Sequence, residues 1–361
     1  MRALPNPLRI LSCTVTLDVS LIYRCQSEKI PVLLKPIHYT QLNHNKIPIM
    51  TKLRTAVIGV GYLGKFHAQK YASLDASQLI AVCDTNQEVA KGIADEHGIG
   101  VTHDYHDLPG KVDAVSIVVP TQKHYEVASF FLQNNIHVLL EKPITSTVEE
   151  ATKLVTLAKA NNLVFQIGHL ERFNPAIIAL EDILKQPLFI ESHRIAPFNP
   201  RGADVNVVLD LMIHDIDIIL DFVSSPVKHI STNGVQVLSQ DIDIANARIE
   251  FESGCVANVT SSRVSVKSER KMRLFQQDAY ISIDFQDKKL AVYRKGSGEM
   301  FPGISDVNSE ECTFEQGDAL LSEISSFLDC IRNNKEPVVS GQAGLRALET
   351  AIEITRLLNL Q

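Results

Sequence analysis

Short apolar runs alternate with segments of helical character over the first regular part of the chain. The apolar runs are Thr55–Val60, Leu79–Cys83, Ala114–Val119, His137–Leu140 and Val164–Ile167. The helical segments between them are Leu63–Leu74, Gln87–His97, Lys123–Asn134 and Val148–Asn161. Continuously apolar strands that alternate with helices are typical of parallel βαβ units buried on both faces. The pattern therefore predicts a doubly wound parallel sheet, a Rossmann-type α/β domain, over residues 50–170.

The pattern changes after residue 225. Apolar and polar residues alternate at Ala247–Phe251 and Ile281–Phe285, and Glu252–Gly254 indicates a hairpin turn. Helical stretches close the chain at Ala319–Arg332 and Gly344–Leu358. We therefore expect an α+β domain over 171–361 with an open, mostly antiparallel sheet. Because an exposed sheet face needs a cover, we predict a homo-oligomer, a dimer or tetramer, formed through this sheet.

The leading segment 1–49 does not share this regularity. It has six basic and two acidic residues, and five of the 15 prolines. It shows no sustained helical or strand period. We interpret it as a disordered extension or a mispredicted start, with the folded protein beginning near Met50. A transit peptide is the alternative, because the segment is poor in acidic residues.

Composition narrows the class of protein. The chain has 361 residues, 45% of them hydrophobic, and a net charge of −7. These values exclude wholesale disorder and a globally basic nucleic-acid binder. The sequence contains no run of about 18 apolar residues, so it predicts no membrane span. The six cysteines are scattered without a CxxC or Cys/His cluster, so we expect no metal site and a reduced, cytoplasmic compartment.

A glycine-rich turn follows the first predicted strand. Gly59, Gly61 and Gly64 form a GxGxxG pattern that opens a helix, with Tyr62 and Leu63 inside it. In this context the glycines allow a tight turn, close approach of a pyrophosphate, and close packing of the helix. The helix N-terminus then offers free N–H groups to the phosphates. The alternative is a glycine-rich turn without a ligand.

Asp84 follows the second strand, twenty positions after Gly64. A carboxylate there accepts hydrogen bonds from the ribose hydroxyls and repels a 2′-phosphate, so NAD is favoured over NADP. With Gln87 three residues later, Asp84 is also a candidate helix cap, and the two roles are compatible.

Glu141, Lys142 and Pro143 follow the fourth apolar run, at the strand ends where parallel sheets bind ligands. A lysine near the positively charged nicotinamide should have a lowered pKa, which suits a proton acceptor or a donor to a substrate hydroxyl. Solvated surface is the simpler interpretation of the tripeptide alone.

Val207–Phe222 predicts a buried helix with one polar stripe. At helical spacing Asp210, His214, Asp217 and Asp221 share a narrow face, while Asp215 points elsewhere. We expect the Asp210 carboxylate to contact His214, orient the imidazole and support its positive form while the ring takes a proton from an alcohol. An ordinary surface pair is the alternative.

A second alternative for this helix is a metal site formed by Asp210, His214 and His193. No ligand spacing supports it.

The three motifs together resemble the Gfo/Idh/MocA oxidoreductase family over residues 52–360. The resemblance implies that Lys142, Asp210 and His214 are catalytic, and that Pro120, Thr121, His124, Glu141 and Lys142 contact the cofactor. It implies nicotinamide-dependent oxidation of a sugar or cyclitol hydroxyl to a ketone. Inositol or free-sugar oxidation, reduction of a non-sugar substrate and a non-catalytic NAD-sensing regulator remain alternatives.

A narrower similarity is to the members of this family that oxidise the 3-hydroxyl of UDP-N-acetylglucosamine, in the supply of 3-amino sugars for lipid A. It rests on the segments 59–74, 168–176 and 197–220. It implies that Arg172, Asn174, Arg194 and Arg201 face a nucleotide sugar, because arginine suits a diphosphate. Each of the arginines is otherwise an ordinary surface residue.

Overall fold

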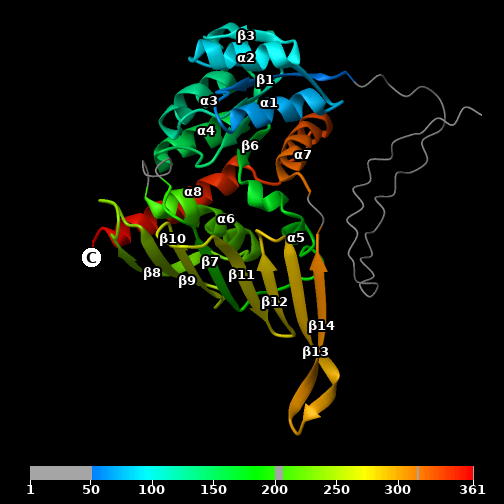
Figure 1. Ribbon diagram of the computed structural model, residues 1–361, viewed down its shortest axis with the longest axis vertical. Helices are drawn as coiled ribbons and strands as arrows, with labels where there is room; N and C mark the ends of the chain where they lie inside the picture. Colours follow the sequence, from blue (N-terminus) through cyan, green and yellow to red (C-terminus); the bar gives the residue numbers. More distant parts are fainter. Residues whose placement is uncertain (1–50, 200–205, 315–316, 361) are drawn as a thin grey trace, which may run out of the picture.

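The computed structural model of the protein describes residues 51–199, 206–314 and 317–360. These residues form two sheets, one above the other in Figure 1, with helices between and around them. The segment 1–49 and Arg201 lie outside the described residues, so the predictions made for them are not addressed by the fold.

The first sheet has six strands in the order β3-β2-β1-β4-β5-β6, and every pairing is parallel. The strands are β1 (Leu53–Ile58), β2 (Ser77–Cys83), β3 (Gly100–Thr102), β4 (Ala114–Ile117), β5 (His137–Glu141) and β6 (Phe165–Gly168). The predicted doubly wound sheet is confirmed. The sequence did not predict β3, because a strand of three residues, none of them buried, shows no apolar run.

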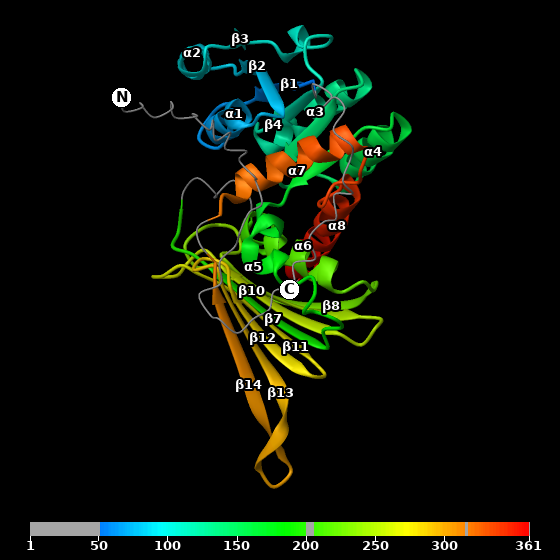
Figure 2. The ribbon, with the colours of Figure 1, turned by 90° about the vertical axis from the view of Figure 1, so that its right-hand side faces the viewer.

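Helices cover both faces of this sheet. They include α1 (Gly64–Ser73), α2 (Gln87–His97), α3 (His124–Gln133), α4 (Val148–Ala160), α7 (Ala319–Asn333) and α8 (Gly341–Leu358). Successive strand residues point to opposite faces, so Val57 packs with α1, α2 and α7, whereas Ala56 packs with α3, α4 and α8. The two closing helices therefore belong to the core of the first sheet, although they are distant in sequence, and Figure 2 shows them between the sheets.

The second sheet has eight strands in the order β14-β13-β12-β11-β7-β10-β9-β8. They are β7 (Phe189–Ile195), β8 (Val227–Val235), β9 (Ile244–Phe251), β10 (Val256–Ser262), β11 (Glu269–Gln276), β12 (Ala279–Asp284), β13 (Lys289–Phe301) and β14 (Ile304–Thr313). Only the β7–β10 pairing is parallel among these described strands, so the predicted mostly antiparallel sheet is confirmed.

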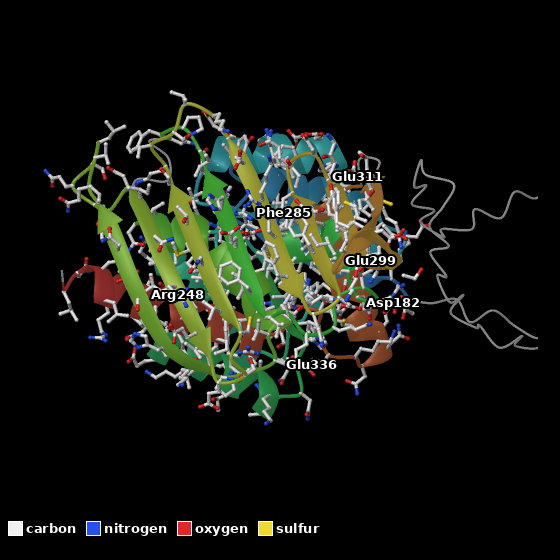
Figure 3. All side chains as sticks on the ribbon, turned by 90° about the horizontal axis from the view of Figure 1, so that it is seen from below. Asp182, Arg248, Phe285, Glu299, Glu311 and Glu336 are labelled. Atoms are coloured by element: carbon white, nitrogen blue, oxygen red, sulfur yellow. The ribbon has the colours of Figure 1, made fainter. Side chains whose placement is uncertain are left out.

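One face of the second sheet packs against helices α5 (Pro175–Ile178), α6 (Ile213–Phe222) and α8. Its buried core includes Ile190, Met272 and Ile283 from the strands and Ile216 from α6. Seen from below in Figure 3, the strands lie in front and the helices behind them. The layer of helices between the sheets therefore packs against both sheets.

Within the described ranges no helix is long and apolar enough to cross a membrane.

Candidate active site

The glycine turn after β1 has the geometry that the motif predicts. Gly59 has a φ of 83°, and a Cβ on it would lie 2.5 Å from the carbonyl oxygen of Val118. A Cβ on Gly64 would lie 1.9 Å from the carbonyl oxygen of Gly59, whereas one on Gly61 would meet nothing within 4 Å. The first and third glycines therefore let the turn close, and the second leaves the backbone open to a ligand.

Beside this turn lies a cavity of about 540 Å³, at the point where the strand order reverses between β1 and β4. Open parallel sheets bind ligands at such a switch point. Residues that line it include Gly59, Gly61, Asp84, Thr85, Tyr105, Val119 and Pro120. Thr121 begins a short 3₁₀ turn directly after Pro120, and Tyr62 and Leu63 are exposed on the glycine turn.

Asp84 fixes the backbone at the cavity wall. One carboxylate oxygen accepts a hydrogen bond from the N–H of Val60 and the other from the N–H of Asn86, each at 2.8 Å. The cap of α2 is Asn86, whose side chain accepts from the N–H of Val89, so the alternative that Asp84 caps this helix is wrong. Each Asp84 oxygen keeps a lone pair for a further donor. An open glycine backbone, this carboxylate and apolar walls fit a dinucleotide such as NAD.

His124 lies at the start of α3, beside the loops that follow β4 and β5. It is buried, with 1% of its surface exposed, and its two ring nitrogens lie 2.8 Å from the carbonyl oxygen of Pro143 and 2.9 Å from that of Val119. Burial lowers the pKa of His124, and a neutral ring donates to one of these two oxygens. His124 thus ties the loop after β5 or the loop after β4 to α3, and its contact with the cofactor stays a prediction.

Glu141 ends β5, and its carboxylate is hydrogen-bonded to a buried histidine of α1. His67 lies 3.2 Å from a Glu141 carboxylate oxygen through Nε2, and 3.2 Å from the hydroxyl of Ser116 through Nδ1. Burial favours the neutral acid, but the hydrogen bond from His67 and the charge of Lys142 outweigh burial, and the pKa of Glu141 is lowered. The carboxylate next to Lys142 is therefore ionised.

Lys142 reaches across to the second domain. Its ammonium donates a hydrogen bond of 2.9 Å to the main-chain carbonyl of Asp210 and lies 3.9 Å from the Asp210 carboxylate. Burial lowers the pKa of Lys142, and the carboxylates of Asp210 and Glu141 offset part of this effect. The amine can therefore donate a hydrogen bond, and its lowered pKa makes the loss of a proton easier.

The helix predicted over Val207–Phe222 is not uniform. Its first part, Val208–Met212, is a π-helical turn, and α6 follows from Ile213. The wider turn breaks the i, i+4 alignment, and no hydrogen bond joins the Asp210 carboxylate to His214 in the described part of the chain. The predicted Asp210–His214 contact is therefore wrong, and Asp210 meets Lys142 instead.

His214 lies in a positive environment. Burial lowers its pKa well below the usual histidine value, and the charges of Lys142, Arg194 and Arg270 act in the same direction. The imidazole is therefore neutral at pH 7 and able to accept a proton. This corrects the expectation that a carboxylate supports its positive form.

The residues predicted to face a nucleotide sugar are engaged inside the protein. Arg194 is 3% exposed and bonds the carboxylates of Asp215 and Glu171. Arg172 is 7% exposed and bonds Asp221 near the end of α6. Both guanidinium groups are thus paired with carboxylates inside the protein, and that they face a nucleotide sugar stays a prediction.

The third of these residues, Asn174, is buried. It caps α5, and its amide donates to the carbonyl oxygen of Phe285 at 3.2 Å. The side chain is thus hydrogen-bonded within the protein, and its contact with a nucleotide sugar stays a prediction.

Other residues at the site were missed by sequence reasoning. Arg270 on β11 has a side chain that is 52% exposed and lies 3.5 Å from Glu171, and its charge acts on both Lys142 and His214. His67 and His169 are buried against the site. The only signal for His67 is its place on the inner face of the helix after the glycine turn. Nothing in the sequence marks Arg270.

The metal alternative finds no support in the geometry. His193 is exposed on β7, on the face of the sheet opposite to Arg194. No group of three His, Cys, Asp or Glu side chains that could hold a metal ion occurs between residues 51 and 360, outside the gaps at 200–205 and 315–316.

Comparison with known proteins agrees with this geometry. Residues 53–169 match the model of an oxidoreductase family with an NAD-binding Rossmann fold, and residues 193–282 match the GFO/IDH/MocA C-terminal domain. The chain is 41% identical to UDP-N-acetylglucosamine 3-dehydrogenase from Acidithiobacillus ferrooxidans, over 84% of this chain and 97% of that protein. It is 26% identical to scyllo-inositol 2-dehydrogenase (NAD(+)) from Bacillus subtilis, over 84% and 93%.

Solved structures extend the likeness to three dimensions. A structure of the Acidithiobacillus enzyme has a TM-score of 0.81 at 40% identity, covering 86% of this chain and 99% of that chain. Levoglucosan dehydrogenase in complex with NADH and levoglucosan has a TM-score of 0.76 at 17% identity over 86% and 98%, which shows the shared fold. The two-domain architecture, the dinucleotide cavity and the close relative show that the chain belongs to the GFO/IDH/MocA family of NAD-binding oxidoreductases.

Proposed function

We propose that this chain oxidises the 3-hydroxyl of UDP-N-acetylglucosamine to a ketone, with NAD⁺ as the hydride acceptor. The observation on which this depends is the 41% identity to UDP-N-acetylglucosamine 3-dehydrogenase, which extends over 97% of that enzyme. The inositol dehydrogenase relative is 26% identical over a similar share. The 3-keto product suits an aminotransferase that forms a 3-amino sugar nucleotide for lipid A.

The proposed chemistry divides between two side chains. His214 takes the proton of the sugar hydroxyl, because its lowered pKa leaves a neutral ring at pH 7. Lys142 donates a hydrogen bond to the same oxygen and stabilises the negative charge that develops on it. NAD, when bound, would supply the acceptor for the hydride that leaves the carbon bearing this hydroxyl. Asp210 holds Lys142 through its main-chain carbonyl.

Arg270 is our candidate for the diphosphate of the substrate. Its guanidinium is half exposed and is close enough to Lys142 and His214 to influence the pKa of both. A planar guanidinium binds phosphate oxygens in pairs. Arg194 and Arg172, by contrast, would have to break buried ion pairs to reach a substrate.

We also propose that two copies associate through the outer face of the second sheet. A row of aromatic rings crosses this face, formed by Phe189, Phe275, Tyr280 and Tyr293 with centroid separations of 5.0–5.8 Å. The row continues over four adjacent strands that carry no helix in front of them (Figure 3). Aromatic rings surrounded by charged side chains are typical of the centre of an interface.

The substrate proposal is tested by following NAD⁺ reduction with UDP-sugars, free sugars and inositols. We expect UDP-N-acetylglucosamine to give the highest kcat/KM, and NAD⁺ to be preferred over NADP⁺. Loss of the 3-hydroxyl, as in a 3-deoxy analogue, should abolish the reaction while the analogue still binds. Turnover of inositols without turnover of nucleotide sugars would contradict the proposal.

Lys142→Met and His214→Ala should each lower kcat by about 10²–10⁴-fold, the usual contribution of a positioned acid–base group. NAD affinity, measured by fluorescence titration, should be largely unchanged because the dinucleotide cavity does not include either residue. Lys91→Met on exposed α2 is the matched control and should retain full activity. Full activity of both site variants with the physiological sugar would refute the assignment.

Asp84→Asn should raise the KM for NAD⁺ by roughly 10- to 100-fold, because hydrogen bonds to a charged group are worth about 1.5–3 kcal/mol. Removing the charge should also reduce the discrimination against the 2′-phosphate of NADP⁺. Asp95→Asn, an exposed carboxylate on α2, is the control. An unchanged KM for NAD⁺ in the Asp84 variant would show that this carboxylate serves the turn alone.

Tyr280→Glu should dissociate the proposed assembly, because it places a charge in the middle of the aromatic row. Sedimentation velocity of the wild-type chain at micromolar concentration should give a dimer or tetramer, and the variant a smaller species. Val89→Glu, on exposed α2, should sediment like the wild type. A wild-type chain that sediments as a monomer would contradict the proposal.

A further inference from the structure

A buried histidine that the proposed chemistry does not use lies beside His214. His169 follows β6, is 1% exposed, and has no hydrogen-bond partner on either ring nitrogen. Its ring centroid is 6.3 Å from that of His214, and the two rings are nearly perpendicular. His67 and His124 are equally buried, yet each ring nitrogen of both residues has a polar atom within hydrogen-bond distance. His169 therefore differs from the histidines that serve the packing of this protein.

His214 also has a buried ring nitrogen without a partner. Its Nδ1 is buried and has no hydrogen-bond partner. When an imidazole accepts a proton at one nitrogen, it can release one from the other. A proton that leaves from the buried Nδ1 needs a carrier within the protein, and His169 is the nearest ring.

Two carboxylates follow His214 on one stripe of α6, at helical positions i+3 and i+7. Asp217 is 3% exposed, its Oδ2 has no hydrogen-bond partner, and this oxygen lies 3.9 Å from the Nε of Arg172. One helical turn further, Asp221 has a side chain that is 48% exposed and bonds Arg172 at 2.7 Å. Asp221 and Arg172 line a cavity of about 630 Å³ that does not include Lys142 or His214.

We infer that His169 and Asp217 carry the hydroxyl proton from His214 to solvent at Asp221, by a route separate from the dinucleotide cavity. The inference rests on the proposed dehydrogenase function. In each turnover the hydroxyl O–H bond breaks and its proton joins His214, the C–H bond of the carbon that bears this hydroxyl breaks and its hydride goes to NAD⁺, and a C=O bond forms. A proton passes from His214 to His169, then to the Asp217 carboxylate, and then to water. One proton is released for each NAD⁺ reduced, and every group returns to its starting state.

The separation of the rings sets how the first transfer takes place. At 6.3 Å between centroids the rings are too far apart for a direct hydrogen bond between nitrogens, so one bridging water or a rotation of His169 is needed. Burial lowers the pKa of His169, and charges of both signs face the ring. Lys142 and Arg172 disfavour a proton on His169, whereas Asp217 and Glu141 favour it. His214 faces Lys142, Arg194 and Arg270, which drive its proton onward.

The burial of Asp217 makes it a suitable last carrier. Desolvation raises its pKa, and the charges of His169, Arg172 and Arg346 oppose this effect. A carboxyl group whose pKa is raised above the usual value of an aspartate accepts a proton from an imidazole more readily. His169 and Asp217 act through His214 and are therefore positioning and relay residues.

The test uses the full-length protein with His169→Phe, which keeps a ring of similar size, and Asp217→Asn, which keeps the shape of the side chain. We expect each to lower kcat by roughly a hundredfold, at the lower end of the contribution of a proton-transfer group. The KM values for sugar and NAD⁺ should stay near those of the wild type, and the solvent deuterium isotope effect on kcat should increase. His229→Phe, on the exposed edge strand β8, is the control.

Two results would overturn the relay. One is an unchanged kcat and isotope effect in variants that melt like the wild type. The other is a raised KM or a lowered melting temperature without a larger isotope effect, which is the result of a purely structural role. If the wild type oxidises a different polyol, the substrate proposal fails, and the same variants are measured with that polyol.

A titration without cofactor or substrate supplies an independent readout. In protein with labelled histidines, NMR should show that His169→Phe raises the pKa of His214, because His169 is one of the groups that lower it. Asp217→Asn should lower the pKa of His169, because this carboxylate favours its charged form. Unchanged titration curves for both histidines would show that the three groups are not coupled and would overturn the relay.

Discussion

The hydrogen bond from the Lys142 ammonium to the main-chain carbonyl of Asp210 holds the two halves of the candidate site together. Lys142 follows the last residue of a strand in the first sheet, and Asp210 lies in the π-helical turn that leads to α6 over the second sheet. A main-chain acceptor cannot rotate away as a side chain can, so the position of the amine is set by the backbones of both domains. Any movement between the domains would separate Lys142 from His214.

Burial and the positive charges around this contact together explain why the imidazole of His214 is neutral. Lys142, Arg194 and Arg270 all disfavour a second proton on His214. Arg194 is held in place by Asp215 and Glu171, and a buried ion pair of this kind is costly to break. Its function in the structure is therefore a fixed charge behind the site. This is a different use of an arginine from the phosphate contact that its residue type suggests.

The parts that could be predicted from the sequence are those in which structure and chemistry are local. The turn from Gly59 to Gly64 joins a strand to a helix within a few residues, so its spacing alone indicates its shape. Asp84 and Lys142 follow apolar runs, and the ends of parallel strands meet at one edge of the sheet. No long-range contact is needed to place any of these residues near a dinucleotide.

What could not be predicted from the sequence depended on contacts between distant residues or on a departure from regular helix geometry. Asp210 and His214 are aligned only if the helix keeps 3.6 residues per turn, and the π turn at Val208–Met212 removes this condition. Arg194 and Arg172 have the residue type of a phosphate site, but their partners Asp215 and Asp221 come from α6. Only the packing of α6 against both arginines decides their role.

The polar side chains of α6 show how a buried helix can serve structure and chemistry at once. Burying a polar group without a partner costs free energy, so such groups are normally paired. Asp215 follows this rule through Arg194, and Asp221 through Arg172. His214 and Asp217 depart from it, since each has a buried atom without a hydrogen bond. Both lie on the face of α6 near His169. The free-energy cost of burying an unpaired polar atom is therefore confined to the groups that must gain and lose a proton. The ion-paired residues Asp215 and Asp221 keep the helix in place.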